Sequence, residues 1–253
     1  MNSMTVALIS FACMFSGALI GWFLCYLVPN HHMSEKERDV VKLSAGLIAT
    51  LAALVLGLLV STAKNSLDTM NSELIQNSAK IIMLDRTLNQ YGPETKDIHD
   101  ILRRNIATVL DRIWPEDKSK KVHVENNDVT YGMERIQLKL RNLVPNSDSQ
   151  RYLQSQAQQL VSDLAQTRWL IIEQSQQKLP TVFIIILIFW LTMLFVSFGL
   201  LAPHNPTIIA VLLICSLSVS GAVLLILEMN NPLDGMIKVS SAPFRNAFDR
   251  INK

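Results

Sequence analysis

Charged side chains are missing from three long stretches of the chain. No Asp, Glu, Lys or Arg occurs within residues 1–34, 43–63 or 179–227. A helix needs about 20 predominantly apolar residues to cross the roughly 30 Å hydrocarbon core of a bilayer. The last stretch is long enough for two such helices, with the turn sequence Pro-His-Asn-Pro at 203–206 between them. The pattern predicts four transmembrane helices, over residues 5–28, 43–63, 180–202 and 207–227.

The second span continues beyond the membrane without a break. Ser34 and Glu37 have the spacing of a capping box, and no proline follows until Gly92-Pro93 ends the helical pattern. The sequence therefore predicts one helix from Met33 to Tyr91, about 85 Å long at a rise of 1.5 Å per residue.

This long helix carries a seven-residue repeat. The repeat comprises Gly46, Ala49, Ala53, Leu56, Val60, Ala63, Leu67, Met70, Leu74, Asn77, Ile81, Leu84, Leu88 and Tyr91. Its members are mostly small in the lipid half and large in the aqueous half, with Asn77 as the polar exception. Helices associate by close approach at small residues in lipid, and by burying large apolar residues in water. The repeat predicts a partner helix, from the same chain or from another subunit. Asn77 would either set the register of that pairing or meet a Gln or Ser of the 149–178 helix.

The first span contains its own packing signal. Gly17 and Gly21 form a small-xxx-small pair that lets a neighbouring helix approach closely. We expect this pair to pack against the second span, in preference to forming a dedicated dimer contact.

The region between the second and third spans is polar. Residues 64–178 hold 16 Lys or Arg and 15 Asp or Glu, and their apolar positions recur with helical spacing. A helix opened by Pro93 should end at Trp114, a loop should cover 116–128, and a short helix should be broken by Pro145. A last helix, capped by Ser147 or Ser149, should return to the membrane antiparallel to the outgoing one. The predicted fold is an all-α integral membrane protein with four transmembrane helices and a cytoplasmic helical bundle inserted between the second and third.

This reading divides the chain into four parts. They are a transmembrane pair (1–63), the soluble insertion (64–178), a second pair (179–227) and a C-terminal tail (228–253). An amphipathic segment at 240–251 should lie on the membrane surface or cap the soluble helices.

Charge places the insertion on one side of the membrane. Four spans put both termini and residues 64–178 together, and that side holds 20 of the 23 Lys and Arg residues. Basic residues favour the cytoplasmic side, so we expect these parts to be cytoplasmic. The net charge of +2 is too small to indicate a nucleic-acid partner.

The sequence contains no recognisable catalytic motif. HExxH, P-loop, GxSxG and CxxC patterns are absent, which argues against an enzyme. Cys13, Cys25 and Cys215 all fall in hydrophobic spans without ligand spacing, so neither a metal nor a cofactor is predicted. Glu228, at the end of the fourth span, is an interfacial acid and a candidate functional residue.

A polar stripe follows one face of the long helix. Its members are Thr50, Gly57, Ser61, Asn65 and Asp68. The stripe is either the lining of a hydrated ion path or a small-residue packing face that becomes solvated outside the membrane. The residues alone do not separate these two interpretations.

Three segments resemble the bacterial bestrophin-like membrane family, a domain of unknown function. They are ATLAALVLGLLVSTAK at 49–64, QTRWLIIEQSQQKLP at 166–180 and NNPLDGMIKVSSAPFRNAF at 230–248. Bestrophins are pentameric anion channels in which the second transmembrane helix lines the pore. The resemblance implies a homo-oligomeric, ion-conducting protein of the bacterial inner membrane, with the 43–72 helix near its axis.

The chain departs from bestrophins in two respects. It has no phenylalanine between Phe23 and Phe183, and no acidic run like a calcium clasp. The alternative function is a membrane-anchored scaffold or signalling partner without conductance.

Overall fold

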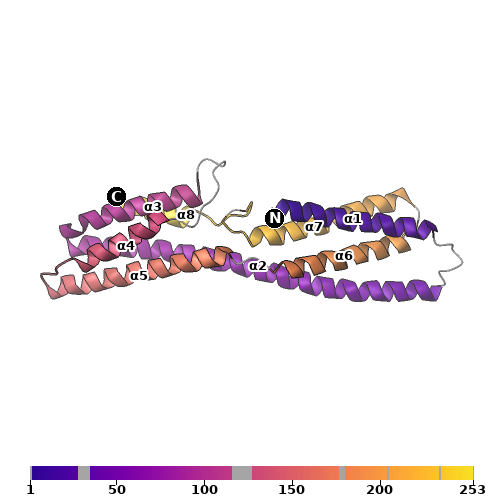
Figure 1. Ribbon diagram of the computed structural model, residues 1–253, viewed down its shortest axis with the longest axis horizontal. Helices are drawn as coiled ribbons and strands as arrows, with labels where there is room; N and C mark the ends of the chain where they lie inside the picture. The colour runs from indigo at the N-terminus through magenta and orange to yellow at the C-terminus, as the bar shows by residue number, and fades with distance from the viewer. Residues whose placement is uncertain are drawn as a thin grey trace. The chain divides into compact units, whose positions relative to one another are not determined.

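The computed structural model describes residues 2–27, 35–115, 127–176, 180–203, 205–233 and 235–252. All regular structure within these residues is helical (Figure 1). The helices are α1 (Ser3–Leu27), α2 (Glu35–Tyr91), α3 (Lys96–Ile113), α4 (Asn127–Arg141), α5 (Asp148–Gln176), α6 (Thr181–Leu201), α7 (Pro206–Met229) and α8 (Ala242–Ile251), with a short 3-10 helix, η2 (Pro93–Thr95), after α2. Four of them, α1, α2, α6 and α7, are long and apolar enough to cross a membrane, as the sequence predicts.

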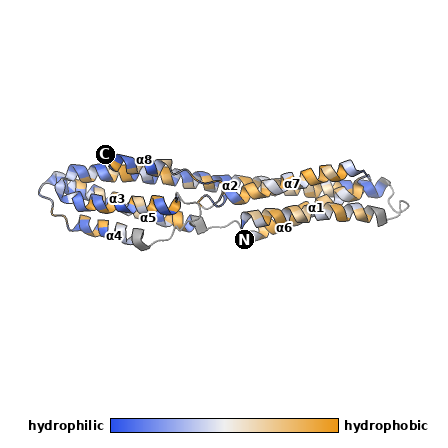
Figure 2. Cartoon of the chain, turned by 90° about the horizontal axis from the view of Figure 1, so that it is seen from above, coloured by the Kyte–Doolittle hydropathy of each residue, from blue (hydrophilic) through white to orange (hydrophobic). Residues whose placement is uncertain are grey.

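Contacts divide the chain into two compact units. Unit 1 comprises Met1–Ser66 and Lys178–Asn230, and unit 2 comprises Leu67–Gln177 and Asn231–Lys253. Hydropathy differs between them: α1, α6 and α7 are largely hydrophobic, whereas α3, α4 and α8 carry many hydrophilic residues (Figure 2). Each unit has its own buried apolar cluster.

The long helix ends where the sequence predicts. After Tyr91, Gly92 adopts a φ of 131°, a backbone conformation that glycine tolerates and other residues rarely adopt. The Thr95 hydroxyl then donates a hydrogen bond of 2.9 Å to the carbonyl of Leu88, which satisfies an acceptor at the helix end. The predicted start at Met33 and Ser34 lies outside the described residues.

In unit 1, the glycines of α1 pack against α6. A Cβ on Gly17 would lie 3.0 Å from Thr192 Cγ2, and a Cβ on Gly21 would collide with the carbonyl of Val196. Gly199 of α6 makes the reciprocal approach, because a Cβ there would meet the carbonyl of Ala18. The expectation that Gly17 and Gly21 pack on the second span is therefore wrong. A glycine on both facing helices allows backbone contact from both sides, which makes α6 the better partner.

In unit 2, α5 returns antiparallel to α2, as expected. Gln150 Nε2 donates to the Tyr91 carbonyl at 3.1 Å, and Gln174 Nε2 donates to Glu73 Oε1 at 2.8 Å. The first turns of α5 thus contact the C-terminal end of α2, and the last turns of α5 contact a more N-terminal part of α2, so the two helices run antiparallel. The N-terminus of α5 is capped by Ser147, whose hydroxyl accepts from the Gln150 N–H at 3.1 Å.

The tail helix α8 packs on the other helices of unit 2. Phe244, Ala247 and Ile251 are buried in the apolar cluster. Trp114 Nε1 donates to the Val239 carbonyl at 2.9 Å, and Arg103 Nε donates to the Ile251 carbonyl at 3.0 Å. Of the two placements expected for this segment, the structure shows the second, a cap on the helices of the insertion.

The loop predicted at 116–128 ends earlier than expected. Helix α4 begins at Asn127, whereas the sequence places loop residues up to Asp128. The rest of that loop, residues 116–126, lies outside the described residues.

Candidate functional site

One face of α2 in unit 1 is not covered by the chain itself. Ala45, Ala52, Leu59 and Ala63 are buried against the apolar cluster of unit 1. The opposite face includes the predicted stripe, and Thr50, Gly57, Ser61 and Asn65 are all exposed. A Cβ built on Gly57 would meet no other atom within 4 Å. The stripe lies on the uncovered face of a span whose other face is packed.

The packed face differs from the predicted repeat in this unit. Gly46 and Ala53 belong to the repeat but are exposed, whereas their neighbours Ala45 and Ala52 are buried. The other repeat members of this unit lie on the packed face: Ala63 is buried, and Ala49, Leu56 and Val60 pack against the cluster. In unit 2 the repeat is correct, since its members from Met70 to Tyr91 are buried. An α-helix drifts by about 20° per heptad relative to a strict seven-residue repeat, so a register that fits one end of a long helix shifts at the other.

The hydroxyl of Thr50, at the membrane end of the stripe, is held by a hydrogen bond within its own helix. Thr50 Oγ1 donates a hydrogen bond of 2.8 Å to the Leu47 carbonyl of its own helix. Back-bonding of this kind satisfies the hydroxyl proton and leaves the oxygen lone pairs facing outward. Asp68, which belongs to unit 2, is exposed and is engaged in an interaction, as is Lys64 of unit 1.

The other candidate residues lie in buried surroundings. Glu228 is only 7% exposed near the end of α7 and is engaged by neighbouring groups. Asn77 is 5% exposed in unit 2, and its Oδ1 has no hydrogen-bond partner among the described residues. The Gln or Ser partner considered for Asn77 therefore does not reach this oxygen. Asn77 is buried at its position in the repeat, and its role in setting the register stays a prediction.

The hydroxyls of the fourth span fall into two kinds. Ser216 and Ser218 donate to carbonyls of their own helix at 2.8 Å. Ser220 instead donates to the Ala7 carbonyl of α1 at 2.6 Å and is buried. This bond ties α7 to α1 and gives Ser220 a structural role.

A buried contact between a histidine and an aspartate is not apparent from the sequence. His99 Nδ1 lies 2.9 Å from Asp85 Oδ1, and both side chains are nearly enclosed. Asp85 also accepts from Asn89 Nδ2 at 3.2 Å. The pair joins α2 to α3 across the turn at Gly92, and a separation of 14 residues in sequence gives no helical signal for it. Within the described residues, no three His, Cys, Asp or Glu side chains gather to hold a metal ion.

The described residues thus form a helical structure with four helices that are long and apolar enough to cross a membrane, as in a membrane protein. A family model, the bestrophin-like domain, matches residues 12–244. The chain therefore belongs to the bestrophin-like family. No curated protein and no solved structure matches the chain.

Proposed function

We propose that this chain assembles into a homo-oligomeric ion channel of the bacterial inner membrane, with α2 near the pore axis. The observation that carries the proposal is the uncovered face of α2, where Thr50, Gly57 and Ser61 are exposed within the uncharged span and Asn65 is exposed just beyond it. Membership of the bestrophin-like family supports it.

Lipid gives these polar groups no hydrogen-bond partners. Exposed leucines, Leu47, Leu54 and Leu58, lie on the same side of the helix. Symmetric copies of α2 around one axis would place hydroxyls, an amide and exposed backbone along a hydrated path. Gly46 and Ala53, on the same exposed side, allow the copies to approach closely.

The proposed selectivity for anions rests on the family resemblance and not on the residues of the stripe. Neutral dipoles coordinate ions of either sign, and the bestrophin resemblance favours anions. Asp68, one turn beyond Asn65 on α2, would repel anions if it faced the axis. We therefore propose a weakly selective anion path with Asp68 turned toward Lys64, its i−4 neighbour. Both termini and residues 64–178 would lie in the cytoplasm, following the distribution of basic residues.

Assembly and flux test the proposal together. Native mass spectrometry in mild detergent should show a single oligomer, and chloride-loaded proteoliposomes should release chloride. Gly57→Leu should reduce the flux and leave the oligomer intact. Gly221→Leu is the matched control, because a Cβ at Gly221 of α7 also meets nothing within 4 Å. A clean monomer would contradict the proposal.

The second candidate function is a membrane-anchored scaffold without conductance. It is favoured by exposed large apolar side chains on unit 2, such as Tyr131 (59% exposed) and Leu138 (60% exposed) of α4. Exposed apolar side chains of this kind mark interaction surfaces when they form a contiguous patch. A folded oligomer with no flux would favour this function.

A further inference from the structure

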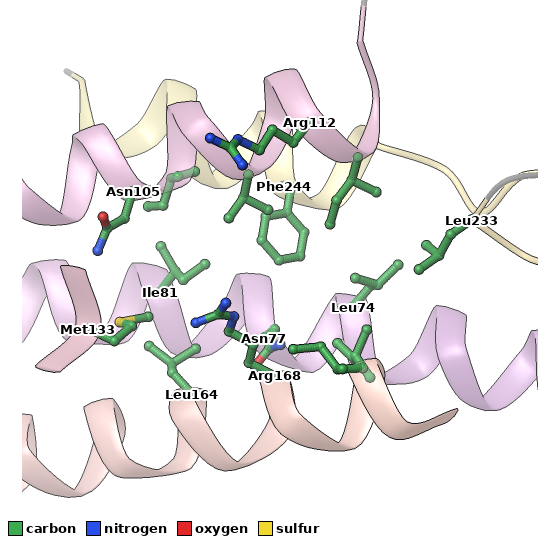
Figure 3. A pocket seen from close by; sticks show the side chains of 15 residues that line it. Leu74, Asn77, Ile81, Asn105, Arg112, Met133, Leu164, Arg168, Leu233 and Phe244 are labelled. Carbon is green, nitrogen blue, oxygen red and sulfur yellow. The ribbon is translucent and has the colours of Figure 1, made fainter. Parts of the chain in front are cut away.

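Unit 2 encloses a cavity of about 90 Å³ between its helices (Figure 3). Its walls are mainly branched aliphatic side chains from α2, α3 and α5. Ile81, Val109 and Leu164 represent these three helices, and Phe244 of α8 closes another side. An apolar cavity with a few convergent polar groups is the usual form of a small-molecule site.

Two buried amides at this cavity lack partners. Asn77 is 5% exposed and Asn105 is 9% exposed. The Oδ1 of Asn77 and the Nδ2 of Asn105 have no hydrogen-bond partner among the described residues. Buried polar atoms in folded proteins are nearly always paired, so these two atoms are available to a water molecule or a bound ligand in the cavity. An amide can rotate to exchange its oxygen and nitrogen, so each can donate as well as accept.

The same cavity carries positive charge. Arg112 of α3 and Arg168 of α5 line it, both half-buried, and Figure 3 shows them on opposite sides. Each already interacts with another group of the chain, but a guanidinium has five N–H donors and can bind a ligand as well. Burial lowers the pKa of the Arg168 guanidinium, which nevertheless stays charged at neutral pH. Among the described residues that line the cavity, none is acidic. The site thus combines an apolar body with cationic groups and amides.

Asn105 lies between this cavity and a second hollow nearer the surface. It lines this outer hollow of about 280 Å³ together with Arg104, Tyr131, Gly132 and Arg135. The Asn105 amide lies against Gly132, where a Cβ would collide with it. Two arginines at the outer hollow attract anions toward it.

We propose that the cavity binds a short-chain monocarboxylate. The carboxylate accepts hydrogen bonds from the Arg168 guanidinium and from the neighbouring Asn77 amide, and the alkyl chain contacts the aliphatic walls. Guanidinium donors match the geometry of a carboxylate better than any other side chain. The cavity volume limits the length of the alkyl chain. For comparison, a cavity of about 150 Å³ accepts benzene, and a water molecule occupies roughly 30 Å³. A ligand of butyrate size is the expected limit, and the proposal does not depend on ion conduction.

Calorimetric titration of the full-length protein in detergent tests this site. Sodium butyrate should bind saturably at one site per chain against a sodium chloride background. Butyramide has the same shape without the charge and should bind at least tenfold more weakly. Equal affinities for the two compounds, or no saturable butyrate binding, would overturn the proposal.

Two variants locate the binding in the cavity. Arg168→Gln should weaken butyrate binding at least tenfold and leave butyramide unchanged. Arg151→Gln is the matched control, because this exposed arginine lies on the same helix and contacts Asp148. Val109→Phe should fill the cavity and abolish binding of both compounds. Circular dichroism and gel filtration check that each variant is folded, and unaltered butyrate binding in folded Arg168→Gln and Val109→Phe would place the ligand elsewhere.

Discussion

Replacing Asn77 by leucine should stabilise the protein. Asn77 occupies a buried position of the α2 repeat between Leu74 and Ile81, and its Oδ1 is unpaired. A buried acceptor without a partner costs about 1–3 kcal/mol, and a leucine of similar size removes that cost. The cavity beside Asn77 leaves room for the branched side chain. We therefore expect Asn77→Leu to raise the free energy of unfolding by about 1–3 kcal/mol.

Thermal melting followed by circular dichroism measures this effect. A change of 1 kcal/mol shifts Tm by about 2–4 °C for a chain of this size, so the melting temperature should rise by roughly 2–12 °C. The matched control is Asn71→Leu, which makes the same exchange at an exposed position of the same helix. Surface exchanges usually change stability by less than about 0.5 kcal/mol. A lower Tm for Asn77→Leu than for the natural chain would refute the reasoning.

Three further predictions concern the helix contacts and the topology. Gly199→Val should break the approach of α6 to the Ala18 carbonyl and lower Tm by several degrees, whereas Gly221→Val should leave it unchanged. The hydrogen bond from Lys139 lowers the pKa of the Asp97 carboxyl. The contact therefore stabilises the folded protein above the unfolded-state pKa of Asp97, about 3.9, and this stabilisation is lost as the pH falls through the lower pKa of the folded state. Asp97→Asn should thus reduce Tm slightly at neutral pH and not in strong acid; a difference that persists in acid would contradict this sign. Cysteines placed at Gln166 and Asp249, in a background without the natural cysteines, should be labelled only from the cytoplasmic side, and labelling from the other side would contradict the topology.

The sequence predicts the helices of this protein better than their partners. Missing charge marks each apolar helix, and Gly92-Pro93 marks the end of α2, because these signals are local. The helix that packs against Gly17 and Gly21 cannot be predicted from a local signal, because any helix with a small residue at the contact would fit. In the structure this small residue is Gly199 of α6. Likewise, the seven-residue repeat gives the buried face of α2 in unit 2, but in unit 1 two of its members, Gly46 and Ala53, lie outside the packed face.

The candidate sites also differ in how far the sequence predicts them. Thr50, Gly57, Ser61 and Asn65 share a face by helical spacing, so their common face follows from the sequence, whereas the exposure of that face is seen only in the structure. The cavity of unit 2 combines residues from five helices, and no periodicity relates Asn77 to Asn105 or Arg168. The contact of Asp85 with His99 is equally invisible, because it depends on how α3 folds back after η2.

Current recorded from the purified oligomer in planar bilayers tests the channel most directly. Under a salt gradient, the natural chain should give a current that reverses near the chloride potential. Ser61→Trp should abolish that current, because the indole would occupy the uncovered face of α2. The matched control is Ser218→Trp, an exposed serine of α7 whose hydroxyl also bonds its own helix, and it should conduct normally. A well-folded natural oligomer without current, or undiminished current in Ser61→Trp, would contradict the proposed channel.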